Sequence, residues 1–150
     1  MKKHNEALLN NESLSLYDPV TKITTILRVY QIGLNTYSLI DNDIFNYKLT
    51  RGTEIKTRIN IEGNHEILDI VKLSSLITKR YILNSQFKES EYRVIGDELI
   101  KHGGYWQIDF GKIATINLPS DCKINIKEIF LTFDFNPEEM EGDSHLPIIK

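Results

Sequence analysis

The segment EIKTRINIEGNHEILDIVKL (residues 54–73) decides the fold class. In its first half, apolar or β-branched residues alternate with polar ones: Ile55, Thr57, Ile59 and Ile61 against Glu54, Lys56, Arg58 and Asn60. A period of two places these two sets on opposite faces of a β-strand. Glu62-Gly63-Asn64 predicts a turn, and the apolar residues between Glu66 and Leu73 predict the partner strand. The segment therefore predicts an antiparallel hairpin.

Other parts of the chain also have the composition of strands. They are rich in β-branched and aromatic residues and are bounded by turn residues, and they cover 22–33, 37–40, 78–83, 105–110 and 112–118. Gly111 separates the last two and predicts a hairpin connection, since glycine adopts the conformations that tight turns require.

The pattern changes to a helical one between Ser85 and His102. Tyr92, Ile95 and Leu99 recur at steps of three and four, which indicates an amphipathic helix. We expect Asn84 or Ser85 to cap this helix and Gly103-Gly104 to end it. Gly96 lies inside the helix, where it costs about 1 kcal/mol relative to alanine.

Residues 122–134 fit two patterns. Ile126, Ile129, Phe130 and Phe133 would share one face of a helix, whereas Ile129, Leu131 and Phe133 would share one face of a strand. We favour the helix, with Ser120 or Asp121 as its cap.

The order of these elements predicts an α+β fold, in which about two helices pack on one face of a mainly antiparallel sheet. A length of 150 residues is typical of one domain. We expect a loosely ordered segment over residues 1–20, a single domain over 21–136 and an acidic, flexible tail over 137–150.

The charge distribution argues against a nucleic-acid partner. The formal net charge is −3, but residues 134–143 hold five acids and no base, and the rest of the chain has 16 acids against 18 bases. A nucleic-acid-binding protein usually presents a basic face, so this balance predicts no nucleic-acid partner.

No stretch reaches the length of about 20 apolar residues that crosses a membrane. The lone Cys122 and the short apolar run near the N-terminus favour the cytoplasm.

No motif indicates catalysis, a cofactor or a metal. The four histidines have no second ligand at a metal-binding spacing, and Asp41-Asn42-Asp43 lacks the glycine and glutamate of a calcium loop. No phosphate-binding glycine loop occurs. Cys122 lies beside Lys123, but a lone cysteine is more often a small buried side chain than a nucleophile. We therefore expect a protein without catalytic activity.

Two features favour recognition of a protein. Tyr105 and Trp106, the only tryptophan, would be an anchor if exposed, although a ring of that size more often belongs to the core. The acidic residues Glu138, Glu139, Glu141 and Asp143 would steer a basic partner.

Three short motifs stand out: Tyr92-Arg93-Val94-Ile95, Gly103-Gly104-Tyr105-Trp106 and the strand from Gly111 to Pro119. They resemble a bacterial family known as domain of unknown function 4265. Tyr37-Ser38-Leu39, Ile44-Phe45-Asn46-Tyr47 and Arg51-Gly52-Thr53-Glu54-Ile55 resemble the preceding part of that family, whose members often have Gly-Asp where this chain has Gly52-Thr53. The resemblance covers about two thirds of the chain, and its motifs are structural, so it implies no active site.

Two functions follow as expectations. The first is a non-catalytic protein-binding module, in particular an immunity-type inhibitor that covers a basic toxin domain. The alternative is a small enzyme or small-molecule-binding domain with a pocket between sheet and helices, involving His102, Asp109 or Arg93.

Overall fold

The computed structural model of the protein describes residues 11–83, 89–132 and 138–140. The chain forms two compact units, Met1–Ser75 (unit 1) and Leu76–Lys150 (unit 2). The expectation of one domain over residues 21–136 is therefore corrected. The reason is that, over the described residues, the strands pair in two separate sheets, one in each unit, and each unit has a hydrophobic core of its own.

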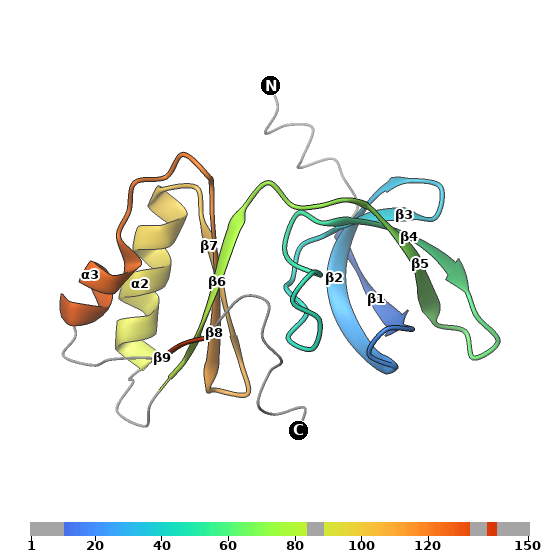
Figure 1. Cartoon of the computed structure of the whole chain (residues 1–150), viewed down its shortest axis with the longest axis horizontal. Helices are drawn as coiled ribbons and strands as arrows, with labels where there is room; N and C mark the ends of the chain where they lie inside the picture. The colour runs from blue at the N-terminus through green and yellow to red at the C-terminus, as the bar shows by residue number, and fades with distance from the viewer. Residues whose placement is uncertain (1–10, 84–88, 133–137, 141–150) are drawn as a thin grey trace. The chain divides into compact units, whose positions relative to one another are not determined.

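Unit 1 is a closed barrel of five strands (Figure 1): β1 (Asn11–Asp18), β2 (Ile23–Gly33), β3 (Thr36–Leu39), β4 (Glu54–Ile59) and β5 (His65–Lys72). Each strand pairs antiparallel with the next one along the chain. When an odd number of strands alternate in direction, the first and the last run the same way. Accordingly, β1 and β5 close the barrel as a parallel pair.

The first strand corrects the expectation of a loosely ordered segment over residues 1–20. Residues 11–18 pair with β2 from Asn11↔Tyr30 to Asp18↔Ile23. Leu14 and Leu16 are buried in the barrel core, which supplies the free energy that orders this segment. Residues 1–10 lie outside the described part of the chain.

The antiparallel pairing of β4 with β5 confirms the hairpin predicted over residues 54–73. Of the alternating residues expected on its apolar face, only some are buried. Ile55 and Thr57 point into the barrel, and the Thr57 hydroxyl lies 3.0 Å from His65 Nδ1. Ile59 and Ile61 are exposed because β4 ends at Ile59 and the chain turns there. The other core residues are Leu14, Leu16, Leu27, Val29, Tyr37, Leu39 and Leu49.

Over its described residues, unit 2 is a four-stranded antiparallel sheet with two helices (Figure 1). The strand order is β7 (Tyr105–Asp109), β8 (Ile113–Leu118), β6 (Ile77–Ile82) and β9 (Glu138–Met140). The helices are α2 (Glu89–Lys101) and α3 (Ile126–Thr132). The α+β fold is thus confirmed, and the hairpin at Gly111 joins β7 to β8 with positive φ angles of 57° at Phe110 and 62° at Gly111.

The helix favoured over residues 122–134 is confirmed between Ile126 and Thr132. Its cap is Asn125 and not Ser120 or Asp121, because Asn125 Oδ1 accepts hydrogen bonds from the backbone nitrogens of Lys127 and Glu128 at 3.0 and 3.3 Å. The caps expected for the other helix, Asn84 and Ser85, lie outside the described residues.

Both helices pack on one face of this sheet. Ile95 and Leu99 of α2 and Ile126 and Phe130 of α3 form one cluster with residues of β6 and β8. The Tyr81 and Phe130 rings meet edge to face, with centroids 4.8 Å apart. This geometry is the favourable one for an aromatic pair, because the positive edge of one ring faces the negative face of the other.

Gly96 in the middle of α2 has a tertiary role. A β-carbon built at this position would overlap Nε1, Cε2 and Cζ2 of the Trp106 indole. Trp106 is partly buried and packs against the core of unit 2. The glycine therefore makes room for the indole ring against the helix.

The C-terminal region corrects the expectation of a flexible tail over residues 137–150. Glu138–Met140 is β9, and its pairing with β6 runs from Ile82↔Glu138 to Arg80↔Met140. Met140 is buried, so the strand has a core contact as well as backbone pairing. The residues after Met140 lie outside the described part of the chain.

Candidate binding groove in unit 1

The barrel of unit 1 has a seam where β1 leaves β5. The parallel pairing covers only Leu16↔His65 and Tyr17↔Glu66, after which β1 ends at Asp18. β5 continues to Lys72. Among the described residues, Ile67–Lys72 pairs with β4 alone, so one edge of this part of β5 has no neighbouring strand.

Two irregularities shape β5 along this seam. The pairing passes from Lys56↔Asp69 to Thr57↔Ile67 and from Glu54↔Lys72 to Ile55↔Ile70, so Leu68 and Val71 are extra residues on the β5 side. Such bulges bend a strand and increase its twist. Ile67 and Ile70 pack against the barrel core, whereas Leu68 and Val71 are exposed.

A groove of about 540 Å³ lies along this seam. Its walls come from three segments of unit 1: residues 18–20 after β1, residues 46–49 in the connection between β3 and β4, and residues 67–70 of β5. Its large exposed apolar side chains are Val20 (83% exposed), Tyr47 and Leu68 (48% exposed).

The turn after β1 is built around the buried carboxylate of Asp18. Asp18 Oδ1 accepts from the Val20 backbone nitrogen at 3.0 Å, and Oδ2 accepts from the Thr21 hydroxyl at 3.2 Å. Asn46 Nδ2 also donates to Oδ2, at 2.7 Å. These bonds hold Val20 at the rim of the groove and connect its first wall (residues 18–20) to its second wall (residues 46–49).

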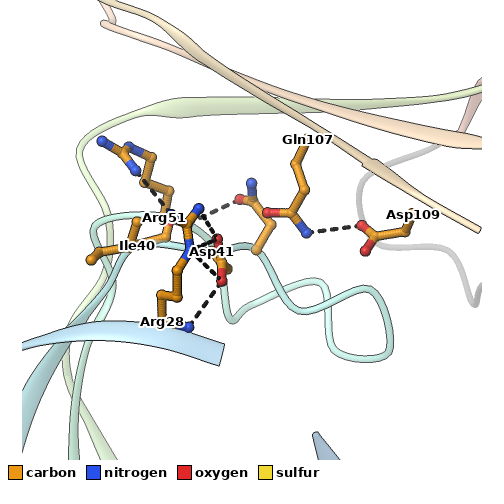
Figure 2. Close-up of polar contacts among 7 residues, drawn as sticks. Arg28, Ile40, Asp41, Arg51, Gln107 and Asp109 are labelled. Atoms are coloured by element: carbon orange, nitrogen blue, oxygen red, sulfur yellow. Dashed lines mark hydrogen bonds and ion pairs between the residues drawn. The ribbon is translucent and has the colours of Figure 1, made fainter. Parts of the chain in front are cut away.

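The connection between β3 and β4 is anchored by an ion pair (Figure 2). Arg28 Nη2 lies 2.7 Å from Asp41 Oδ1, and the Arg28 backbone nitrogen donates to Asp41 Oδ2 at 2.9 Å. Arg51 Nη1 donates to the Ile40 carbonyl at 3.1 Å, and the Arg51 backbone nitrogen donates to Asn42 Oδ1 at 2.9 Å. Asp41, Asn42 and Asp43 lie in this connection, and their side chains form hydrogen bonds that fold it.

The second wall is ordered by local hydrogen bonds. Asn46 Oδ1 accepts a hydrogen bond from the Lys48 backbone nitrogen at 3.0 Å. The Asn46 backbone carbonyl accepts one from the Leu49 backbone nitrogen, also at 3.0 Å. Such bonds from an asparagine side chain stabilise a turn. Leu49 is buried in the barrel core, which leaves Tyr47 and Lys48 exposed at the groove.

The carboxylates near the groove differ in their partners. Glu66 forms an ion pair with Arg58 across the strands, at 3.3 Å. Asp69 is exposed and lies opposite Lys56, and its carboxylate forms no ion pair or hydrogen bond with the part of the chain that the structure describes. Since the Asp18 carboxylate is already satisfied, Asp69 is the acidic group of the groove that is available to a ligand.

The predicted site residues that the structure describes lie in unit 2, on the two outer strands β7 and β9 of its sheet. Trp106 packs against the core and beneath α2 at Gly96, so it is not the exposed anchor that the sequence allowed. Tyr105 is half-buried on the opposite face of the sheet, because adjacent residues of a strand point to opposite sides. Glu138 and Glu139 are exposed on β9, while Glu141 and Asp143 lie outside the described residues.

Glu139 also affects a buried tyrosine. It lies opposite Tyr81 in the β6–β9 pair, and it is 3.9 Å from Lys127 Nζ. Burial, and then the negative charge of Glu139, raises the pKa of Tyr81 to about 12. The Tyr81 hydroxyl has no hydrogen-bond partner among the described residues.

This raised pKa predicts alkaline destabilisation of unit 2. The unfolded chain releases the Tyr81 proton near the ordinary pKa of 10.0, whereas the folded chain keeps it up to about 12. The contribution of Tyr81 to the free energy of unfolding is fully present below pH 10 and is lost as the pH rises from 10 to 12. At pH 11 the loss is about 1 kcal/mol. Denaturant unfolding of the wild type and the Tyr81→Phe variant at about pH 9 and 11 measures this loss of stability. An equal loss of stability in both proteins would contradict the assignment.

Three groups with catalytic or metal-binding potential, His65, Cys122 and Asp109, make contacts within their own unit. His65 bonds Thr57 and meets the Tyr37 ring edge to face, and Cys122 packs against the core of unit 2. Asp109 accepts a hydrogen bond from Gln107 Nε2 at 2.8 Å (Figure 2). In the described ranges, no group of three or more His, Cys, Asp or Glu residues could hold a metal ion. Those same ranges contain no helix with the length and apolarity needed to span a bilayer.

Sequence reasoning missed the groove, although one signal for it was present. The residues Ile67-Leu68-Asp69-Ile70-Val71 break the period of two, and the break corresponds to the two bulges. The approach of residues 46–49 to residues 18–20 and 67–70 has no sequence signal, because these segments are far apart in the sequence.

Comparison with known proteins supports the fold and goes no further. No family model and no curated protein matches the sequence, so the resemblance to domain of unknown function 4265 stays a prediction. A solved structure, described as a novel crystal structure of a hypothetical protein from Neisseria gonorrhoeae, is similar with a TM-score of 0.55. The match has 12% sequence identity and covers 91% of this chain and 97% of that one.

Proposed function

We propose that the protein is a non-catalytic protein-binding module and that the groove of unit 1 is its binding surface. The observation that supports this proposal best is the conjunction of exposed apolar side chains with an unpaired strand edge. Val20, Tyr47 and Leu68 line the groove beside that edge of β5. Exposed apolar surface next to unpaired backbone groups is costly unless a partner covers it.

The acidic groups give the proposal a more specific form, in which a cytoplasmic, immunity-type inhibitor covers a basic toxin domain. Asp69 at the groove and Glu138 and Glu139 on β9 are exposed carboxylates. Carboxylates at the rim of an interface accelerate association with a basic partner more than they tighten the final complex. We therefore expect the association rate to fall as the salt concentration rises.

A second function is favoured by the size of the groove. A volume of about 540 Å³ falls within the range of roughly 300–1,000 Å³ that small-molecule sites occupy. This groove belongs to the barrel and not to a space between sheet and helices. Its wall of unpaired strand edge matches an extended backbone better than a compact ligand, so we rank the protein partner first.

The test is capture of a partner by variants that differ at one leucine. Leu68→Ser removes an apolar group from the groove, whereas Leu34→Ser removes one from the exposed β2–β3 hairpin (Leu34 is 85% exposed). We expect the affinity for a protein captured from host lysate by the wild type to fall by about tenfold with Leu68→Ser, which corresponds to about 1.4 kcal/mol.

Leu34→Ser controls for a general effect of removing surface leucines. We expect it to bind like the wild type. Equal binding by Leu68→Ser and the wild type would exclude the groove as the interface, and loss of binding by both variants would exclude a specific site there. Specific retention of a metabolite in place of a protein would favour the second function.

A further inference from the structure

We propose, on the basis of the protein-binding function above, that the groove binds an extended peptide segment that adds to β5 as a new strand. The segment would lie along Ile67–Lys72, place apolar side chains in the groove and present a basic side chain to Asp69.

The backbone of β5 provides the first reason. On one side Ile67–Lys72 pairs with β4, and on the other side the described part of the chain offers it no strand. Alternate residues of a strand direct their N–H and C=O groups to each edge, so the open edge presents unpaired donors and acceptors. An extended peptide satisfies them in series, as in other complexes in which a strand is added to a sheet.

The position of the groove provides the second reason. It begins where β1 turns away from β5 at Asp18, which is the place that the next residues of a neighbouring strand would otherwise occupy. The bulged residue Leu68 and the turn residue Val20 flank it, and Tyr47 faces it from the second wall. A strand lying there would bury apolar side chains at alternate positions, since its residues point alternately toward and away from the groove.

Charge provides the third reason and specifies the peptide further. On the outer face of the β4–β5 pair, Glu66 is neutralised by Arg58, whereas Asp69 has no ion pair among the described residues. Opposite charges on directly facing residues of neighbouring strands stabilise a sheet, and like charges destabilise it. A peptide with lysine or arginine opposite Asp69 is therefore preferred.

The experiment selects a ligand and then tests its backbone. A displayed library of random linear peptides of about twelve residues is selected on the full chain, and the best peptide is synthesised for fluorescence anisotropy. A series of peptides is then made, each with one backbone nitrogen methylated. Methylation removes a donor to the sheet edge and leaves the side chain unchanged. We expect affinity to fall about tenfold at alternate positions and to change little between them.

Three protein variants complete the test. Leu68→Ser should weaken the peptide and Leu34→Ser should not, which places the peptide in the groove. Asp69→Lys should weaken the selected peptide by about tenfold and restore binding to a peptide whose basic residue is replaced by glutamate.

The outcomes separate this proposal from the function on which it rests. Weakening by Leu68→Ser, with no alternation in the methylated series, would overturn strand addition and leave the groove as a protein-binding surface. Failure to select any peptide that depends on Leu68 would also overturn strand addition. If the captured protein partner binds the Leu68→Ser variant as tightly as the wild type, the proposed function itself is wrong, whatever the peptides show.

Discussion

Gly96→Ala is expected to destabilise unit 2 by about 2 kcal/mol, against the direction that helix propensity predicts. Replacing glycine by alanine inside a helix contributes about 1 kcal/mol of stability. The new β-carbon, however, would overlap the Trp106 indole, and overpacking of this kind costs about 3 kcal/mol. The steric cost is larger because the ring is packed against the core and cannot move aside freely.

The measurement is denaturant unfolding, with the fluorescence of the only tryptophan as the signal from unit 2. Asp97→Ala, on the exposed side of the same helix, is the matched control and should not lose stability. In a Trp106→Leu background, followed by circular dichroism, Gly96→Ala should become neutral or stabilising, since the overlap is gone. A stabilising effect in the wild-type background would contradict the packing described for Gly96.

Ile55→Ala is expected to destabilise unit 1 by about 3 kcal/mol, because it removes a fully buried side chain (0% exposed) from the barrel core and leaves a cavity. The effect should be confined to that unit. Hydrogen exchange should accelerate over residues 11–72, while the protection of β6, β8 and α2 and the tryptophan transition remain as in the wild type.

This confinement tests the division of the chain into two units. Each unit has its own core, so the loss of one core leaves the contacts of the other in place. Ile26→Ala, on the exposed face of β2, is the control and should change stability little. Equal acceleration of exchange in both units would show a single cooperative structure in place of two.

Much of the fold could be predicted from local pattern. The hairpin over residues 54–73, the strands on either side of Gly111 and the two helices each follow from a period of two or of three to four. Two segments, residues 11–18 and 138–140, could not. They are short or rich in serine and glutamate, and they are ordered by pairing with β2 and β6 and by the burial of Leu14, Leu16 and Met140.

The candidate site could not be predicted in the same way. The predicted residues Trp106 and Tyr105 are aromatic, but sequence composition does not distinguish an anchor from a core residue, and the space for Trp106 depends on Gly96 ten positions away. The groove brings together residues 18–20, 46–49 and 67–70, none of which has an unusual composition. Its defining property is that β5 continues past the end of β1, and that depends on the register of the two strands.

The sequence by itself determined most of the secondary structure and the α+β class, because these depend on the periodicity of apolar residues within short segments. The tertiary structure decided the division into two units, the closure of the barrel by β1 and β5 and the open edge beside Asp69. The physical reason is that these features depend on which distant segments pair and where the pairing stops, and local periodicity carries no information about either.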